Sequence, residues 1–331
     1  RQETRDLSFQ PDYNRILGLK TNYLSTNRKW SGLAGYSQSF SDQVKGQQHA
    51  FSIENNYNTR SWSFSSRLSQ VGKNYFTDIG FVPRLENYDA LTEQVFRAGY
   101  TQIFQSLSYN YYPENQTQVQ SFRPINAELN LYLDEAGRLY ETNAFYNVAV
   151  FFANQMSLYL NSYHDAIQLN YAFDPLRNGQ FILPDRYQNT AFRLGYNSDY
   201  TRQVYGSVNV QYGSFFEGQR SRFGAVAGFR LLPLFNLELN YEYNALDIGA
   251  LGQADLHLLG LTTELFFSNK LNWTTYLQYN KQIDNFNINS RLQWEYKPLS
   301  FVYLVFSDNY NQLLDRKNWA VSLKVNRRLN F

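Results

Sequence analysis

Apolar and polar side chains alternate with a period of two along almost the whole of this chain. Such alternation places neighbouring side chains on opposite faces of a β-strand. In the last segment, Val321, Leu323 and Val325 share one parity, whereas Ser322 and Lys324 share the other. We count about seventeen segments of this kind, each long enough to be a strand. They span residues 14–25, 31–41, 48–58, 61–71, 101–113, 125–133, 138–152, 155–168, 187–199, 203–212, 221–231, 237–244, 254–268, 271–283, 286–297, 300–311 and 318–331.

The composition suits strands that have one apolar and one polar face. Aromatic residues make up 18% of the 331 residues and Met occurs once, yet the mean hydropathy is −0.52. No run approaches the roughly 18 consecutive apolar residues of a membrane-spanning helix. If the chain lies in a membrane it therefore crosses as strands, and only a closed barrel satisfies the backbone groups of such strands. A soluble β-sandwich also alternates, but its wet face would carry more Lys and Glu and its long strands would be fewer.

These features predict an all-β fold, namely a transmembrane antiparallel β-barrel of the bacterial outer membrane. The connections agree, because such barrels have short periplasmic turns and longer extracellular loops. We expect tight turns at 59–60, 153–154, 232–233, 269–270 and 298–299, with generally longer loops between them, among them 72–100, 169–186 and 213–220. Four of the five tryptophans lie near the tight turns, as an interfacial aromatic belt requires; they are Trp30, Trp62, Trp273 and Trp294.

The strand count bears on the two ends of the chain. The last strand must run toward the periplasm if Phe331 is to end there, so with seventeen strands the first strand starts on the extracellular side. Bacterial single-chain barrels normally have an even number of strands. Either the count is wrong by one, or residues 1–13 are the remnant of an extracellular loop. We expect the second, with residues 14–331 forming the C-terminal part of a barrel of at least about 18 strands.

Three stretches resemble a known family. They are the loop sequence Gly80-Phe81-Val82-Pro83-Arg84, the stretch from Asp12 to Gly18, and the tail from Leu292 to Pro298 with the apolar strand after it. The chain resembles the C-terminal barrel of a Bacteroidota outer-membrane family of unknown function, whose members carry an N-terminal carbohydrate-binding family-9-like domain. The resemblance implies further strands upstream of this chain. It assigns no sugar-binding domain to the chain itself.

Two groups of residues are candidates for a functional role. In the loop motif, Pro83 ends strand pairing and Arg84 can clamp a carboxylate, either for function or as a latch that folds the loop over the barrel mouth. Inward-facing charges either set the selectivity of a pore or pair with one another and stiffen the wall. The charged residues expected to face the lumen are Glu128, Glu238, Glu242, Arg291, Glu295, Lys297, Lys324 and Arg328.

No enzyme, cofactor or metal site is expected. The chain has no cysteine and three histidines, which lie far apart in sequence and in no ligand or triad spacing. A hydrolase rests only on the adjacent His164 and Asp165, which are more often a polar pair at a barrel rim. A net charge of +2 with scattered Lys and Arg gives no argument for nucleic acid.

The sequence leaves two functions open. One is a channel or transport module for oligosaccharides or other nutrients, because Asn, Gln and Tyr on the polar face suit sugar hydroxyls. The other is a scaffold barrel in a larger envelope complex for protein export, barrel assembly or nutrient uptake. The expected partners are outer-membrane lipid, the barrel-assembly machinery, an upstream fragment of the same protein and other envelope proteins. Leu329 and Phe331 form the expected C-terminal assembly signal.

Overall fold

The computed structural model describes residues 13–42, 44–77, 82–115, 118–311 and 315–328. Seventeen strands within them form one antiparallel sheet, and two more form a separate hairpin. The strands are β1 Asn14–Leu24, β2 Trp30–Ser41, β3 His49–Asn58, β4 Trp62–Val71, β5 Glu86–Asp89, β6 Gln94–Arg97, β7 Tyr100–Tyr111, β8 Val119–Leu133, β9 Leu139–Phe152, β10 Ser157–Gln168, β11 Arg186–Asn197, β12 Val204–Phe215, β13 Gly218–Leu231, β14 Phe235–Asp247, β15 Gln253–Ser268, β16 Leu271–Asn280, β17 Asn285–Lys297, β18 Ser300–Tyr310 and β19 Arg316–Val325, with 3₁₀ turns at Gly249–Leu251 and Lys281–Ile283.

Each strand of the large sheet pairs with the next one along the chain, and β4 pairs with β7. The all-β fold, the antiparallel pairing and the count of seventeen strands are therefore as the sequence predicts. The hairpin of β5 and β6 lies within the predicted loop 72–100, and its four-residue strands are too short to show a period. The predicted loop 213–220 is wrong in extent, because β12 and β13 continue to a turn at 216–217. The last strand is shorter than predicted and ends at Val325.

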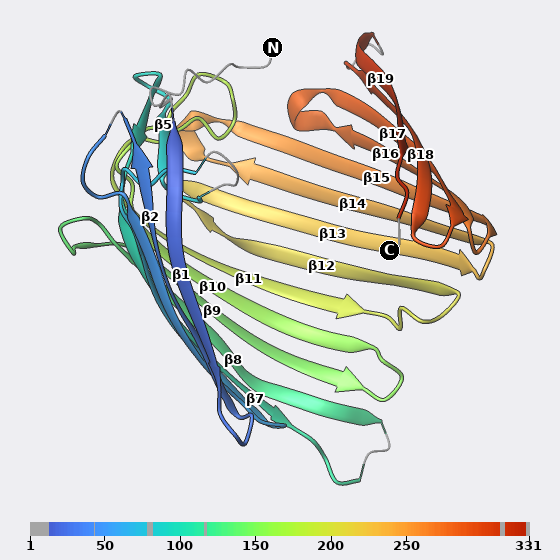
Figure 1. Cartoon of the computed structure of the whole chain (residues 1–331), viewed down its shortest axis with the longest axis horizontal. Coiled ribbons are helices and arrows are strands. Elements are labelled where there is room, and N and C mark those ends of the chain that lie inside the picture. Colours follow the sequence, from blue (N-terminus) through green and yellow to red (C-terminus); the bar gives the residue numbers. More distant parts are fainter. Residues whose placement is uncertain (1–12, 43, 78–81, 116–117, 312–314, 329–331) are drawn as a thin grey trace.

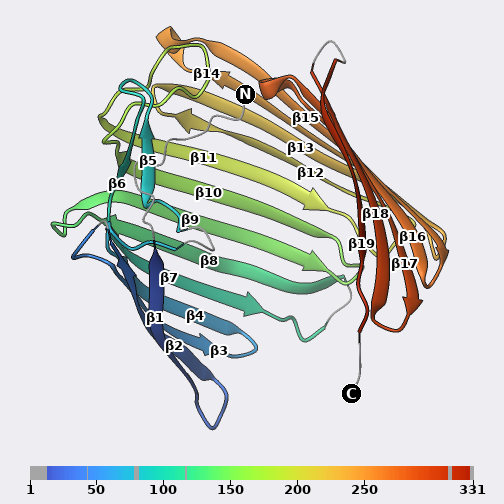
Figure 2. The same ribbon diagram turned by 45° about the horizontal axis from the view of Figure 1, so that its top comes forward.

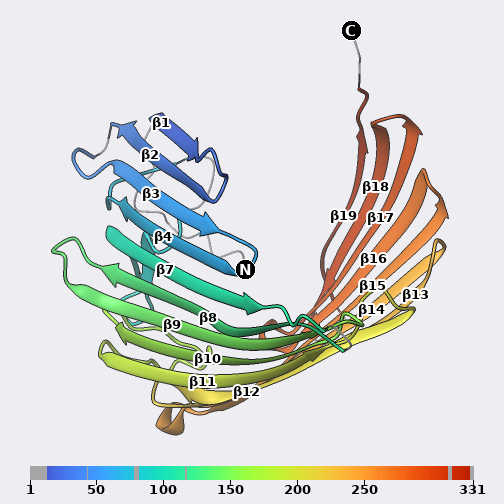
Figure 3. The same cartoon turned by 90° about the horizontal axis from the view of Figure 1, so that it is seen from below.

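The sheet curves into a deep trough (Figures 1 and 3). Strands β1 and β19 form its two edges and face each other across a wide opening in Figure 3. In the described part of the chain, β1 pairs only with β2 and β19 only with β18. The observed architecture is thus a strongly curved, open antiparallel sheet.

The register of the ladders gives the sheet one apolar and one polar face. Leu239 of β14 lies opposite Ala227 of β13 and Leu261 of β15, whereas its neighbour Asn240 lies opposite Val226 and Gly260. Opposite residues share a face, so the parity of each strand carries through the whole sheet. Large apolar side chains are exposed along the outer, convex face, which is unusual for a protein surface in water; examples are Leu17, Leu19, Ile53, Phe192, Leu194, Val210, Tyr212, Leu239, Leu304 and Leu323.

The two ends of the strands differ. The tight turns 59–60, 153–154, 232–233, 269–270 and 298–299 all fall at one end, which we call the turn end, and the long connections fall at the other, the loop end (Figure 1). The four tryptophans near the turn end have 40–50% of their surface exposed on the outer face. Two of them pack against outer tyrosines, Trp30 on Tyr57 at 4.7 Å and Trp62 on Tyr109 at 4.5 Å between ring centroids.

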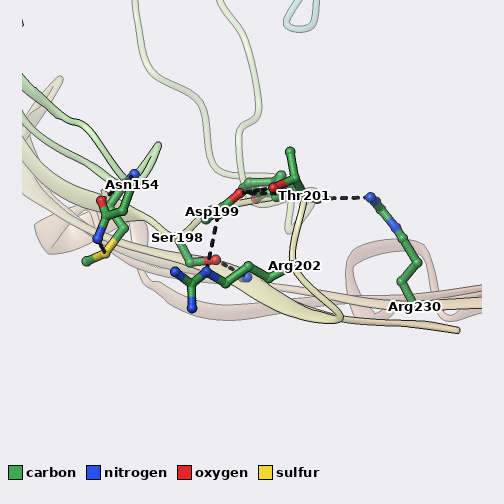
Figure 4. A network of polar contacts seen from close by, with 9 residues as sticks. Asn154, Ser198, Asp199, Thr201, Arg202 and Arg230 are labelled. Atoms are coloured by element: carbon green, nitrogen blue, oxygen red, sulfur yellow. Dashed lines mark hydrogen bonds and ion pairs between the residues drawn. The ribbon is translucent and has the colours of Figure 1, made fainter. Parts of the chain in front are cut away.

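The turns at the turn end satisfy their own polar groups. In the connection between β11 and β12 (Figure 4), the Asp199 carboxylate accepts hydrogen bonds from the Thr201 backbone N–H at 2.8 Å and from Arg202 Nε at 3.2 Å. Arg230 of β13 donates to the carbonyl oxygen of Tyr200 at 2.9 Å, which ties this connection to β13. The Tyr200 ring also packs on the Tyr205 ring, with 4.9 Å between centroids.

The main cluster of buried apolar side chains lies among the loops at the loop end. Leu169 and Ile182 from the connection between β10 and β11 pack with Tyr187 at the start of β11, Leu246 near the end of β14 and Ile248 in the connection after it. The connections therefore fold over one end of the trough. No helix long and apolar enough to cross a membrane occurs among the residues that the structure describes.

The register can be tested by cysteine cross-linking, because the chain contains no cysteine of its own. Val226 lies directly opposite Asn240, so their Cβ atoms should be about 4.5–5.5 Å apart, close to the ~3.5–4.5 Å of a disulfide. We expect the double variant Val226→Cys/Asn240→Cys to form a disulfide on mild oxidation, detected by mass spectrometry of the linked peptides. Ala227→Cys/Asn240→Cys, whose side chains lie on opposite faces, should remain reduced; equal linkage in both pairs would contradict the register.

Candidate functional site on the concave face

The described part of the connection 72–99, which contains β5 and β6, lies inside the curve of the sheet at the loop end (Figure 2). Glu135 holds both ends of this connection, because its carboxylate accepts from the Gly99 backbone N–H at 3.1 Å and lies 3.6 Å from Lys73 Nζ. The Ala90 backbone N–H donates to the carbonyl oxygen of Ala172 at 2.8 Å. The connection is therefore fixed to both β7–β9 and the loop after β10.

Arg84 is the main polar anchor of this connection. Its guanidinium forms a two-pronged ion pair with Glu141 of β9, in which Nη2 lies 2.9 Å from Oε1 and Nη1 contacts Oε2. The same guanidinium lies over the Tyr132 ring, 3.9 Å from its centroid. Arg84 has a φ of 66°, a left-handed backbone conformation that a non-glycine residue adopts only when its surroundings hold it there. A planar guanidinium that pairs with a carboxylate and stacks on a ring gives a rigid contact.

The charge state of this anchor follows from its surroundings. Burial disfavours the charged form of Arg84, but the hydrogen bonds and the negative charge of Glu141 outweigh burial and raise the pKa of the guanidinium above its ordinary value. Burial raises the pKa of the Tyr171 hydroxyl in the neighbouring loop, and the charge of Glu141 adds to that effect. The Arg84 guanidinium is therefore fully charged at neutral pH, and the Tyr171 hydroxyl is neutral.

The structure describes three of the five residues of the loop motif Gly80–Arg84. Val82 is half-buried and Pro83 is exposed, next to the anchored Arg84. Gly80 and Phe81 lie outside the described residues, as do Leu329 and Phe331 of the expected assembly signal.

Three cavities meet at Glu141. One of about 500 Å³ lies between the docked connection and the sheet, with Arg84, Phe96 and Tyr171 in its walls. A second of about 310 Å³ opens beneath the turn between β8 and β9. The third, of about 290 Å³, extends over β10–β13. Polar groups line all three cavities. Glu141 therefore lies where three polar cavities meet at the loop end, and its partner Arg84 lines the first of them.

An arginine cluster, Arg193, Arg220 and Arg222, occupies the wall over β11–β13. Arg193 lies opposite Gln211, and Gln211 lies opposite Arg222, so Arg193, Gln211 and Arg222 form one row across the three strands. Gln211 Oε1 accepts from Arg193 Nε at 2.9 Å and from its Nη2 at 2.5 Å. Arg222 Nη2 lies 2.6 Å from Oε2 of Glu242, one of the carboxylates expected to face inward.

A second polar network lies nearer the turn end. The Tyr205 ring rests on Gly228 of the next strand, where an added Cβ would lie 2.1 Å from the ring. The Tyr205 hydroxyl donates to Glu238 Oε2 at 3.0 Å, and the Arg230 guanidinium lies 4.8 Å from the ring centroid. Asn240 Nδ2 donates to the other carboxylate oxygen of Glu238 at 3.2 Å, so a tyrosine and an amide hold Glu238 on the concave face, and it forms no ion pair with a described residue.

The other charges expected to face inward lie on the concave parity of their strands. Glu128 is opposite Ser106 and Phe145. On β17, Glu295 Oε1 accepts from the Leu299 backbone N–H at 2.8 Å, so it serves the neighbouring turn. Arg291, Lys297 and Lys324 are exposed and form no ion pair with any described residue. Arg328 lies beyond the end of β19, and its backbone N–H donates to Ser300 Oγ at 3.1 Å.

His164 and Asp165 do not form a dyad. His164 lies on the outer face, where its ring contacts Ser162 Oγ at 2.6 Å and Thr190 Oγ1 at 3.1 Å. Asp165 points to the concave face and accepts from Asn143 Nδ2 at 3.0 Å. Successive residues of a strand face opposite ways, so the two side chains cannot act on one substrate. No group of His, Cys, Asp and Glu among the described residues could hold a metal ion.

Sequence reasoning missed Glu141 and the arginine cluster. Glu141, Arg193 and Arg222 occupy positions that alternate with the apolar residues of their strands, and this alternation could have shown that they face inward. The partner of Arg84 is 57 residues away, and no local pattern could identify it. No protein-family model and no curated protein sequence matches this chain.

Removal of the Arg84 side chain should release the docked connection. Arg84→Ala leaves Glu141, whose side chain is 7% exposed, without its cation, and an uncompensated buried charge costs several kcal/mol. We expect a several-fold faster cleavage within residues 82–99 in limited proteolysis of the purified protein.

Arg138→Ala is the matched control, because Arg138 pairs with Asp134 at the same end but its side chain is 81% exposed. Exposed pairs contribute roughly 0–1 kcal/mol, so this variant should be cleaved like the parent. Unchanged cleavage of Arg84→Ala would show that the connection is held by other contacts.

Proposed function

We propose that this chain forms the wall of a bacterial outer-membrane β-barrel that passes oligosaccharides or other nutrients. The observation that carries the proposal is the two-faced sheet, with exposed Leu, Val, Phe and Tyr outside and polar side chains inside. An apolar outer band flanked by aromatic residues is the surface that lipid requires. The exposed tryptophans at the turn end supply one aromatic belt, at the periplasmic interface.

In this proposal the trough is part of a closed barrel. The free edges of β1 and β19 would leave backbone N–H and C=O groups unpaired in lipid, which costs several kcal/mol for each group. At least one further strand therefore pairs with these edges, to give an even total of at least about 18. We assign it to an upstream part of the same protein. Outer-membrane lipid contacts the convex face, and the barrel-assembly machinery receives the C-terminal strand.

The inner wall supports passage of hydrophilic solutes. Amide side chains bond to one another across strands, as in the contact of Asn147 Nδ2 with Asn161 Oδ1 at 2.7 Å and of Gln102 Nε2 with Asn130 Oδ1 at 2.8 Å. Tyrosines lie among them, for example Tyr163 and Tyr205. Barrels of about sixteen or more strands enclose an aqueous lumen, and the connection anchored by Arg84 narrows it at the loop end.

The channel is tested by reconstitution of the native protein in planar bilayers and liposomes. We expect stepwise ion conductance, and swelling of liposomes in sugar solutions at rates that fall with sugar size. A heat-denatured sample of the same preparation is the control for leakage. A folded, inserted protein that gives neither conductance nor swelling would rule out the transport function.

The lipid-facing assignment is tested by adding one charge to either face of β14. Leu239→Arg places a guanidinium on the outer face, where arginine costs about 2–4 kcal/mol near the bilayer midplane. Asn240→Arg places it on the inner face, which is polar and hydrated. We expect the first variant to lower the free energy of unfolding in lipid vesicles by about that amount and the second by less than ~1 kcal/mol. Equal losses would contradict the assignment of the faces.

A scaffold barrel within a larger envelope complex is the second candidate. It is favoured by the docked connection 72–99, because ion pairs between that connection and the wall reduce the open cross-section. Co-purification in mild detergent would separate the two functions. A defined partner together with absent conductance supports the scaffold, and recovery of the barrel alone counts against it.

A further inference from the structure

The arginine cluster carries more positive charge than the residues around it neutralise. Of its three guanidinium groups, only Arg222 has a carboxylate partner, Glu242. Arg193 is bonded to the neutral amide of Gln211. The carboxylates of Asp165 and Glu141 line the same cavity as Arg193 and Arg220, but Glu141 is already paired with Arg84. Three cations thus share two carboxylates.

The cluster also has hydrogen-bond donors that the protein leaves unused. A guanidinium has five N–H donors. Arg220 donates to no acceptor among the described residues; its guanidinium lies over the Phe215 ring, 5.3 Å from the centroid. Arg222 Nε is buried and has no hydrogen-bond partner among the described residues. An unused donor on a buried or half-buried cation is costly, unless a ligand supplies the acceptor.

A cavity lies beside two of the three arginines, Arg193 and Arg220. Its volume is about 290 Å³, and Arg193 and Arg220 both line it, which is near the lower limit of about 300–1,000 Å³ for small-molecule sites. Arg193 stacks over Tyr163, 5.3 Å from the ring centroid, so one aromatic ring supports each guanidinium face. Arg193 Nη1 and the whole Arg220 guanidinium have no hydrogen-bond acceptor among the described residues. Asn143, Asn189 and Ser214 add neutral polar groups to its walls.

We propose that this cavity binds the oxyanion of a small polyhydroxylated solute, such as the carboxylate of a sugar acid or the sulfate or phosphate of a sugar ester. The oxyanion accepts from Arg193 and Arg220 and offsets their repulsion, which is the geometry in which arginine recognises such groups. The amides and Tyr163 contact the hydroxyl-bearing ring. The proposal deepens the transport function by naming its solute class, but binding itself does not require an open pore.

The test is calorimetric titration of the purified full chain in detergent with sodium sulfate, sodium glucuronate and, as the neutral control, glucose. We expect sulfate and glucuronate to bind in competition, at least tenfold more tightly than glucose. If glucuronate binds more tightly than sulfate, the protein also contacts the sugar ring. If the two bind equally, the protein recognises the oxyanion alone, and the proposed contacts to the ring are contradicted. Absence of binding by both anions overturns the site.

Variants separate this site from general attraction of anions. Arg220→Gln should weaken both anions at least tenfold, whereas Asp165→Asn, which removes a negative charge from the cavity wall, should strengthen them several-fold. Arg291→Gln makes the same substitution on the same face at β17 and should leave both affinities within twofold. Equal losses in Arg220→Gln and Arg291→Gln, with thermal unfolding like that of the parent, would overturn the proposal.

Failure of this proposal and failure of the transport function have different signatures. If the protein binds both anions but gives no conductance, the binding site is supported and the channel is contradicted. If it conducts but binds neither anion, the channel is supported and the binding site is contradicted.

Discussion

The register of one continuous antiparallel ladder determines where every side chain of this molecule points. Sixteen neighbouring strand pairs run from β1–β2 to β18–β19, so between bulges the face of a side chain follows from its position in the strand. Bulges such as the one near Tyr109 interrupt the ladder locally. The apolar exterior, the polar interior and the candidate site are all consequences of that register.

The interior gains its detail from contacts that the register permits but does not dictate. Arg193 and Arg222 meet across Gln211 because three strands place them in one row. Arg84 reaches Glu141 because the connection between β4 and β7 is long enough to fold back into the trough. The strand pairing thus determines which residues face inward, and the long connections cover some of these residues and leave others exposed.

The strands and turns could be predicted from the sequence because both depend on residues that are close in the chain. Alternation such as that of Leu237, Leu239 and Tyr241 is visible without a partner strand, and Pro233 marks a turn by itself. The site could not be predicted to the same degree. The contact between Arg84 and Glu141 spans 57 residues, and the row of arginines depends on the registers of two hairpins. The extent of β12 and β13 was also missed, because 213–220 was expected to be a loop, whereas β12 continues to Phe215 and β13 begins at Gly218.

The two open edges of the sheet have a consequence for how the molecules associate. β1 and β19 are each ten or more residues long, exposed along almost their whole length, and rich in apolar side chains. A long bare edge of this kind is a template for any other extended polypeptide. Each molecule has two such edges, so pairing that begins at one edge can continue at the other and join several molecules into one extended sheet.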